Sequence, residues 1–233
     1  MTGHVFGLGV GPGDPELLTL KALARLRAAH VVAYPAPENG RSFARSIVAR
    51  WLSPAQIEIP VRVPIESGAP PESVYDAAAA AIAAELERNR DVAVLCQGDP
   101  FFYGSFIYLF ARLAATHEVE IVPGVSSLAA VAAAAKWPLA ARNDMLAVIP
   151  APLDDAAIER RIACADAIAI VKLGRHFARI RDLLMRLGLT PHARYVERAS
   201  LDNERVLSLA EVAPETVPYF SMIVCHRRGE AWR

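Results

Sequence analysis

Three loops in this sequence combine glycine with residues that can hydrogen-bond to a ligand. Residues 7–15 read Gly-Leu-Gly-Val-Gly-Pro-Gly-Asp-Pro, residues 96–104 read Cys-Gln-Gly-Asp-Pro-Phe-Phe-Tyr-Gly, and residues 122–127 read Val-Pro-Gly-Val-Ser-Ser. Glycine allows a ligand to approach the backbone closely, and the N-terminus of a following helix favours an anionic group. These three loops are therefore the first candidates for a ligand site.

The first loop partly resembles the dinucleotide fingerprint G-x-G-x-x-G. However, Pro12 removes a backbone donor, and Asp14 puts a negative charge where a pyrophosphate group would lie. A nicotinamide oxidoreductase is therefore disfavoured. Taken alone, this loop is also explained by a tight turn in which Asp14 is a helix N-cap and Pro15 the first helical residue.

The elements that must position these loops follow from the hydrophobic pattern. Apolar runs of strand length alternate with segments of helical period along the whole chain, which is typical of α/β proteins with mostly parallel sheets. We predict strands at 5–10, 31–34, 57–65, 92–96, 118–123, 146–149, 167–171, 194–198, 205–209 and 219–225, with residues 35–37 ending the second. We predict helices after Asp14 and at 42–52, 72–89, 105–116, 126–136, 154–163 and 175–187. The last three strands have no room for helices between them, so we expect antiparallel pairing there.

The pattern changes near residues 118–124, where we place a domain boundary. This gives an N-terminal α/β domain at 1–120 and a C-terminal α/β domain at 121–233. The 233 residues are 54% hydrophobic and 21% charged, which excludes disordered and fibrous classes. Lys and Arg number 25, as do Asp and Glu. Without a basic excess, we expect no nucleic-acid partner.

The cysteines indicate the compartment. Cys96, Cys164 and Cys225 lie far apart with no C-x-x-C pair, which favours a reducing compartment and argues against a structural zinc site. The first residues lack the pattern of a signal peptide, and the alanine-rich runs are too short to span a bilayer. We therefore expect a cytoplasmic protein with no membrane partner and no bound metal.

The order and spacing of the three loops are more specific than any one of them. Together they resemble the signature of the tetrapyrrole methylases, which use S-adenosylmethionine to methylate uroporphyrinogen and corrin precursors. Further segments are similar to the branch that methylates C20 of precorrin-2, so that the resemblance covers essentially the whole chain. These segments are residues 34–37, 98–106, 172–177, 195–199 and 218–222. Gln97 departs from that branch, in which an acidic residue is expected.

The resemblance implies a fold of two α/β domains with mostly parallel sheets, an active-site cleft between them, and assembly as a homodimer. It also implies S-adenosylmethionine as the cofactor. Residues 219–222 are a weaker candidate for contact with the adenosine end. The residues expected to contact the cofactor are Pro12, Gln97, Gly98, Asp99, Phe102, Ser126, Ser127, Leu173 and Ala199. For Asp99 there is an alternative role, since an Asp before Pro often stabilises its own turn.

The implied reaction is transfer of a methyl group to C20 of precorrin-2, giving precorrin-3A in cobalamin biosynthesis. In-line transfer requires alignment of the reactants and no side-chain nucleophile, so we interpret Cys96 as buried packing. A proton must then leave, and Tyr103 and His176 are candidate bases beside water or a substrate group. The acetate and propionate groups of the substrate call for cations. Lys172 and Arg175 are our first candidates for binding these carboxylates, ahead of Lys136, Arg142, Arg179 and Arg198.

Three alternatives stay open from the sequence. The acceptor can be cobalt-factor II, which the anaerobic route uses, or another tetrapyrrole such as uroporphyrinogen. The chain can also be a binding protein without transferase activity. We favour the metal-free acceptor because no cluster of residues suggests an axial ligand to a metal.

Overall fold

The computed structural model describes residues 2–64 and 72–229. The chain forms two compact units, residues 1–126 and 127–233, and each is described here by itself. The domain limit predicted at 120/121 lies within strand β5 (Val119–Val122). Because β5 pairs with β1 of the first sheet, the first unit continues beyond that limit to Ser126.

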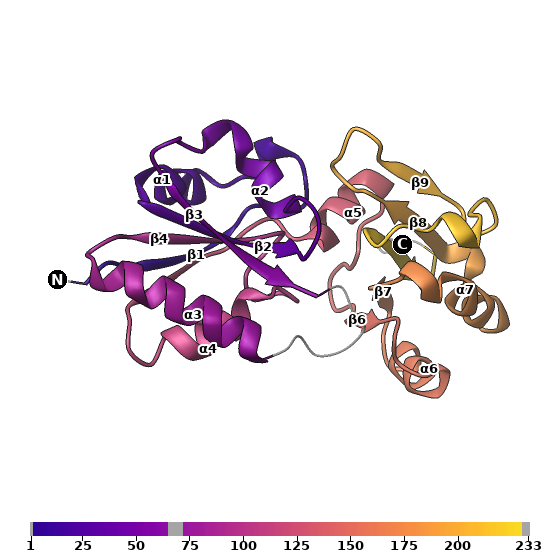
Figure 1. Cartoon of the computed structure of the whole chain (residues 1–233). Helices are drawn as coiled ribbons and strands as arrows, with labels where there is room; N and C mark the ends of the chain where they lie inside the picture. Colours follow the sequence, from indigo (N-terminus) through magenta and orange to yellow (C-terminus); the bar gives the residue numbers. More distant parts are fainter. Residues whose placement is uncertain (1, 65–71, 230–233) are drawn as a thin grey trace. The chain divides into compact units, whose positions relative to one another are not determined.

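The first unit contains a five-stranded sheet in the order β3-β2-β4-β1-β5 (Figure 1). Its described strands pair in parallel throughout. They are β1 (Val5–Gly9), β2 (Val31–Pro37), β3 (Ile57–Val63), β4 (Val92–Cys96) and β5. The fully buried strand β4 lies at the centre, as its continuous apolar run predicts.

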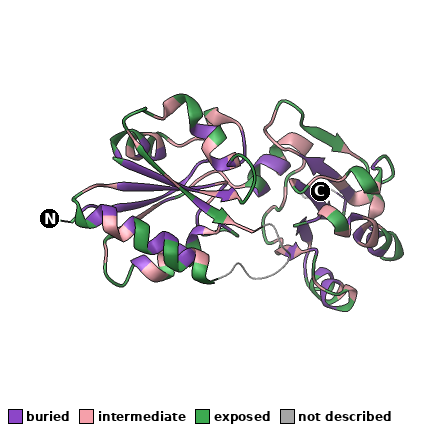
Figure 2. Cartoon of the chain, in the orientation of Figure 1, coloured by how far each residue is buried: buried purple, intermediate pink, exposed green. Residues whose placement is uncertain are grey.

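Helices cover both faces of this sheet. Helices α1 (Leu20–Ala28) and α2 (Phe43–Val48) pack on one face, and α3 (Glu72–Glu87) and α4 (Phe106–Leu113) pack on the other. Strands β1, β2 and β4 are largely buried between these layers, whereas the outer strands β3 and β5 are more exposed (Figure 2). The predicted α/β class is confirmed by this arrangement.

Two local predictions need correction. Strand β2 does not stop at Tyr34 but continues through Pro35 to Pro37. Its pairing with β4 ends at Ala33, so beyond that point one edge of β2 needs no ladder hydrogen bonds and tolerates proline. Asp14 caps only the short 3-10 helix Pro15–Leu17, while Thr19 caps α1.

The second unit contains a mixed sheet in the order β6-β7-β10-β8-β9. Strand β6 (Leu146–Pro150) is parallel to β7 (Ala167–Val171). The other described pairings, through β8 (Ala193–Glu197), β9 (Arg205–Leu207) and β10 (Ser221–His226), are antiparallel. The predicted antiparallel pairing of the last three strands is confirmed, and a mostly parallel sheet describes the first unit only.

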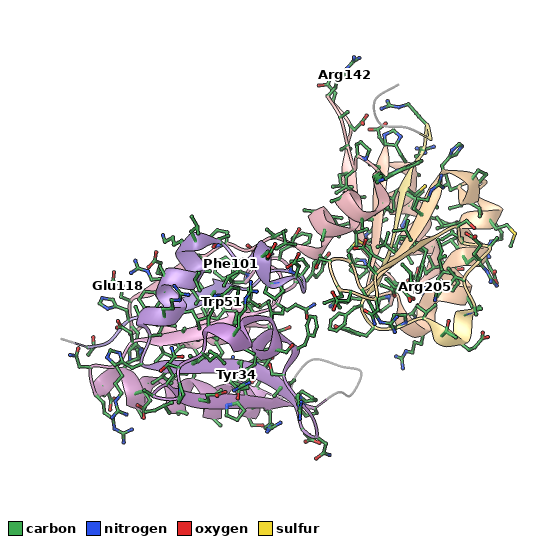
Figure 3. All side chains as sticks on the ribbon, turned by 90° about the horizontal axis from the view of Figure 1, so that it is seen from above. Tyr34, Trp51, Phe101, Glu118, Arg142 and Arg205 are labelled. Carbon is green, nitrogen blue, oxygen red and sulfur yellow. The ribbon has the colours of Figure 1, made fainter. Side chains whose placement is uncertain are left out.

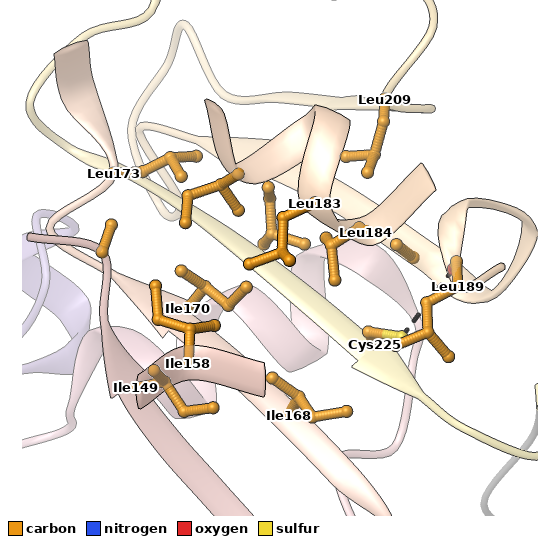
Figure 4. Packing of buried hydrophobic residues seen from close by; sticks show 14 of the residues in the cluster. Ile149, Ile158, Ile168, Ile170, Leu173, Leu183, Leu184, Leu189, Leu209 and Cys225 are labelled. Atoms are coloured by element: carbon orange, nitrogen blue, oxygen red, sulfur yellow. Dashed lines mark hydrogen bonds between the residues drawn. The ribbon is translucent and has the colours of Figure 1, made fainter. Parts of the chain in front are cut away.

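Three helices flank this second sheet. Helices α6 (Asp155–Ala163) and α7 (Phe177–Arg186) pack on one face around Ile170, Leu183 and Leu184 (Figure 4). Helix α5 (Ser127–Ala135) covers the other face. None of the helices that the structure describes combines the length and the apolar character needed to cross a membrane.

Candidate functional site

The first candidate region lies at the carboxyl edge of the first sheet. Strands β1 and β4 are neighbours, but the helices that follow them, α1 and α4, lie on opposite faces. In open α/β sheets, ligands bind at such a switch point. The loops after β1 and β4 are the first two glycine-rich loops of the sequence, and the loop after β5 is the third.

Backbone hydrogen bonds join the first two loops. Gly98 N donates to Gly11 O at 2.7 Å, Gly11 N donates to Gly98 O at 3.3 Å, and Val10 N donates to Cys96 O at 2.9 Å. Gly11 and Gly98 have φ angles of 83° and 68°, a conformation that glycine adopts without strain. Pro12 follows directly and is buried.

The third loop packs against the other two without side chains. A Cβ atom on Gly124 would lie 2.2 Å from Gly98 O, and a Cβ atom on Gly9 would lie 2.4 Å from Gly124 N. Both distances are far below van der Waals contact, so glycine is required at both positions. The three loops thus form one backbone assembly at the switch point.

Asp99 connects this assembly through both carboxylate oxygens. Its Oδ1 accepts a hydrogen bond from Phe101 N at 2.9 Å, and its Oδ2 accepts one from Gly124 N at 3.0 Å. The first bond is the turn expected of an Asp before Pro, and the second ties the β4 loop to the β5 loop. Cofactor contact through the remaining acceptor capacity of this half-buried carboxylate stays a prediction.

The aromatic residues of the second loop are exposed. The exposed fractions are 49% for Phe101, 37% for Phe102 and 51% for Tyr103, and Tyr103 has a left-handed φ of 57°. Phe101 packs its ring edge against Phe110 of α4, so its orientation is constrained. Phe102 and Tyr103 contact each other edge to face, which leaves both at the surface near the switch point.

Cys96 is a buried residue of the first core. The thiol ends the buried strand β4 and is 3% exposed. Burial raises the pKa of Cys96 to about 11, so the reactive thiolate is scarce at neutral pH. The interpretation of Cys96 as packing is confirmed.

The second candidate region lies at one edge of the second sheet. Strands β7 and β8 run in the same direction, because both are antiparallel to β10, which lies between them. Residues 172–176 after β7, residues 198–200 after β8 and the start of β10 therefore lie at the same edge. Arg198 N donates to Phe220 O at 2.8 Å, which joins two of these segments directly.

Leu173 and Ala199, two of the predicted cofactor contacts, differ in burial. The Leu173 side chain is fully buried in the core formed with α6 and α7 (Figure 4). Its carbonyl accepts a hydrogen bond from His176 N at 2.8 Å. Ala199 is half-buried and packs against the opposite core, under α5. Ser126 is half-buried, and Ser127 is the exposed first residue of α5.

The structure divides the predicted substrate cations into two groups. Lys172 and Arg175 are exposed beside the second sheet edge, and Arg142 lies on a projecting loop (Figure 3). The Arg179 guanidinium donates to Asp155 Oδ1 and Ala151 O, and Arg198 donates to Glu197 Oε1 at 2.8 Å. These last two arginines therefore serve the protein's own structure.

His176 is suited to accept a proton. Burial lowers its pKa, and the positive charges of Arg179 and Arg175 lower it further. The imidazole is therefore mainly neutral at pH 7, which is the form that acts as a base. A catalytic role for His176 or Tyr103 stays a prediction.

Two features of these regions escape sequence reasoning. Tyr103, Lys172, Arg198 and Ser200 all have positive φ angles without being glycine, and such strained residues often cluster at functional sites. Glu197, whose side chain is 4% exposed, is a buried carboxylate at the end of β8. The position of Glu197 within the segment 195–199 gave no sign in the sequence that its side chain is buried. Among residues 2–64 and 72–229, no His, Cys, Asp and Glu side chains are grouped so as to hold a metal ion.

Comparison with known families agrees with this geometry. The model of the tetrapyrrole (corrin/porphyrin) methylases matches residues 4–213, which include all three glycine-rich loops. The chain belongs to the tetrapyrrole methylases. In this methylase, the two candidate regions hold every position that the resemblance assigns to the cofactor.

Several relatives are similar over most of this methylase. Precorrin-2 C(20)-methyltransferase of Sinorhizobium sp is 39% identical over 95% of this chain and 94% of its own length. Cobalt-precorrin-2 C(20)-methyltransferase of Salmonella typhimurium is 36% identical over 99% of both chains. Cobalamin biosynthesis protein CobIJ of Mycobacterium tuberculosis is 42% identical over 94% of this chain, which spans only 45% of CobIJ.

A solved structure extends the likeness to the fold. Uroporphyrin-III C-methyl transferase from Thermus thermophilus, complexed with S-adenyl homocysteine, is 30% identical with a TM-score of 0.68. The match covers 96% of this methylase and 97% of that chain.

Proposed function

We propose that this methylase transfers a methyl group from S-adenosylmethionine to C20 of precorrin-2, giving precorrin-3A in cobalamin biosynthesis. The observation that carries the proposal is the 39% identity to the Sinorhizobium precorrin-2 enzyme over nearly the full length of both chains. Segments specific to the C20 branch, such as residues 34–37 and 172–177, fall within that match. The proposal includes a cytoplasmic location and a homodimer, which the resemblance implies.

The residues present fit S-adenosylmethionine as the cofactor. The thioether product of such a donor is bound in the related Thermus structure. In this chain, the left-handed Gly11 and Gly98 join the first two loops at the switch point, and the Asp99 carboxylate can accept a further hydrogen bond from a cationic ligand. The full proposed set is Pro12, Gln97, Gly98, Asp99, Phe102, Ser126, Ser127, Leu173 and Ala199.

The chemistry asks little of individual side chains. The cofactor supplies an electrophilic methyl group on a sulfonium sulfur, and the electron-rich C20 carbon attacks it while the carbon–sulfur electron pair stays on sulfur. The protein must hold the reactants in line, which the rigid loops around Asp99 are built to do. His176 is the proposed base that then accepts the C20 proton, with Tyr103 the second candidate.

Lys172 and Arg175 are the proposed contacts for the carboxylates of the substrate. Both are exposed and lie beside Leu173 at the second sheet edge. Among the described residues, the Arg175 side chain has no carboxylate partner, unlike Arg179 and Arg198. A guanidinium can bind a carboxylate through two parallel hydrogen bonds.

The test is anaerobic incubation of the purified protein with S-adenosylmethionine and freshly generated precorrin-2, followed by mass spectrometry. One added methyl group, placed at C20 with a carbon-13 label on the donor methyl, is the expected result. Heat-denatured protein and protein without the donor are the controls. Tight cofactor binding without methylation would favour a binding protein, and methylation at another carbon would favour another branch of the family.

A second acceptor has a specific observation in its favour. The similarity to the Salmonella enzyme, which is named for cobalt-precorrin-2, is nearly as high as that to the precorrin-2 enzyme. A parallel incubation with the cobalt-containing acceptor therefore belongs in the same experiment. The acceptor with the higher kcat/KM identifies the route.

A further inference from the structure

A buried polar cluster lies beneath the second sheet edge, and the proposed chemistry does not use it. Tyr195 is fully buried, and its hydroxyl donates to Glu197 Oε2 at 2.6 Å. Arg198 Nη1 donates to Glu197 Oε1 at 2.8 Å, and Arg205 Nη1 lies 3.5 Å from the same oxygen. Arg205 is labelled on the second unit in Figure 3. Both oxygens of this carboxylate are therefore bound by the protein itself.

Tyr195 contacts residues next to each of the three segments of that edge. Its ring packs edge to face against Phe177, with centroids 5.4 Å apart, and Phe177 directly follows the loop of residues 172–176. Its backbone pairs with Ile223 of β10, the strand that begins at Ser221. Through Glu197 it reaches the loop of residues 198–200. One buried residue of β8 thus packs beside the end of the loop after β7 and pairs with β10.

The loops of residues 172–176 and 198–200 need support from their surroundings to keep their backbone conformation. Lys172, Arg198 and Ser200 have φ angles of 56°, 53° and 69°, which side-chain-bearing residues rarely adopt unless their surroundings impose it. A buried ionic cluster gives little stability compared with well-packed apolar residues of the same volume. Directional hydrogen bonds to a single carboxylate do, however, define the positions of their donors.

We propose that Tyr195 and Glu197 are positioning residues that hold residues 172–176 and 198–200 in the conformation that binds the methyl donor. This inference rests on the proposed function, because Leu173 and Ala199 are proposed cofactor contacts. It adds two residues that touch neither cofactor nor substrate and act through the loops.

The test compares variants of this cluster with a matched cluster in the first unit. There, Glu58 accepts hydrogen bonds from the Tyr34 hydroxyl at 2.7 Å and from Arg45 Nη2 at 2.7 Å, which repeats the Tyr–Glu–Arg arrangement without any residue of the proposed cofactor set. The variants are Tyr195→Phe and Glu197→Gln, and the control is Glu58→Gln. Dissociation constants for S-adenosylmethionine are measured by calorimetry well below each variant's unfolding temperature.

The two cluster variants are expected to weaken cofactor binding on the order of tenfold, as the loss of supporting hydrogen bonds does at other ligand sites. Glu58→Gln is expected to stay within about twofold of the wild type, the scatter of an independent site. Saturating S-adenosylmethionine is expected to restore most of kcat in Tyr195→Phe, because the groups at the reacting atoms are unchanged.

Three outcomes would overturn the inference. Unchanged affinity in both cluster variants shows that the cluster does not position the loops. Equal weakening in Glu58→Gln shows that the effect is one of general stability. A wild-type protein that does not bind S-adenosylmethionine contradicts the proposed function itself, and the inference falls with it.

Discussion

The two candidate regions solve the same structural problem in different ways. At the first sheet edge, loops approach each other because Gly9 and Gly124 have no side chains to keep them apart. At the second edge, the loops carry lysine, arginine and serine in left-handed conformations, held by a buried carboxylate and tyrosine. The first region thus depends on glycines, which have no side chains, and the second on the hydrogen bonds that its side chains make.

The difference has a consequence for tolerance to change. In the first region an added methyl group collides with backbone atoms, which cannot rotate away. In the second region there is room for side chains, but the hydrogen bonds that orient them are few and specific. Steric changes should therefore act mainly on the first region, and polar changes mainly on the second.

The largest expected effect tests the steric half of this comparison. Gly124→Ala should lower the free energy of unfolding by about 3 kcal/mol, the upper range for overpacking, because its Cβ would lie 2.2 Å from Gly98 O. Gly174→Ala is the matched control, since its Cβ would meet no atom within 4 Å. The control should lose only about 1 kcal/mol, from its positive φ. Urea unfolding of both variants gives the values, and equal losses would break the comparison.

The next effect concerns the proposed base in the second region. His176→Gln should lower kcat by about 100-fold, the lower range for losing a general base, with little change in cofactor affinity. In the wild type, kcat should rise with pH through a pKa below the ordinary 6.5, because the protonated imidazole cannot accept a proton and burial lowers its pKa. A pH profile of kcat checks this. An unchanged profile in His176→Gln would exclude His176 as the base, and a large loss of kcat in Tyr103→Phe would then favour Tyr103.

Asp99 is the polar residue on which the first region depends. Asp99→Ala should weaken S-adenosylmethionine binding by more than about 1 kcal/mol, because its bonds to Phe101 N and Gly124 N are lost. Asp99→Asn keeps one oxygen acceptor, so its affinity for S-adenosylmethionine should lie between those of the wild type and Asp99→Ala. Calorimetry on folded variants measures both. Unchanged affinity in the alanine variant would leave Asp99 as a turn residue only.

The smallest expected effect tests whether the exposed Lys172 contacts the substrate. Lys172→Ala should raise the KM for the tetrapyrrole by about fivefold, the worth of an exposed ion pair, and change the cofactor dissociation constant less. Lys172→Gly should raise KM equally but be more stable than Lys172→Ala, because glycine accepts the φ of 56° without strain. Steady-state kinetics and thermal unfolding separate the two effects. A larger change in cofactor binding than in KM would place Lys172 outside the substrate site.

Much of the fold could be predicted because its signals are local. The fully apolar run of β4 and the amphipathic period of α7 each indicate one element, and the short spacing after residue 190 indicates antiparallel pairing. The continuation of β2 through Pro35 could not be predicted. It depends on where the neighbouring strand β4 stops pairing, which is a property of the sheet.

The candidate site also has a part that could be predicted from the sequence and a part that could not. The glycine-rich loops could be found because glycine at that spacing is itself the signal. Glu197 and Tyr195 could not, since a Tyr-Val-Glu-Arg run reads equally well as a surface strand, and burial of the carboxylate is decided by β10 and α7. Leu173 was predicted as a cofactor contact, but the whole residue is buried beside the hydrophobic core, so that contact stays a prediction.

The place of β10 in the second sheet bears on how this unit can assemble. Strand β10 separates β7 from β8, and Ile223 pairs with both Ile170 and Tyr195. Until residues 221–226 have been synthesised, β6–β7 and β8–β9 are two separate ribbons with unpaired edges, whereas residues 1–126 already contain every described strand of the first sheet. During translation, the first sheet can therefore form while the second still waits for its central strand. The second unit would therefore fold later than the first during synthesis, and it would be the part of the chain more exposed to aggregation.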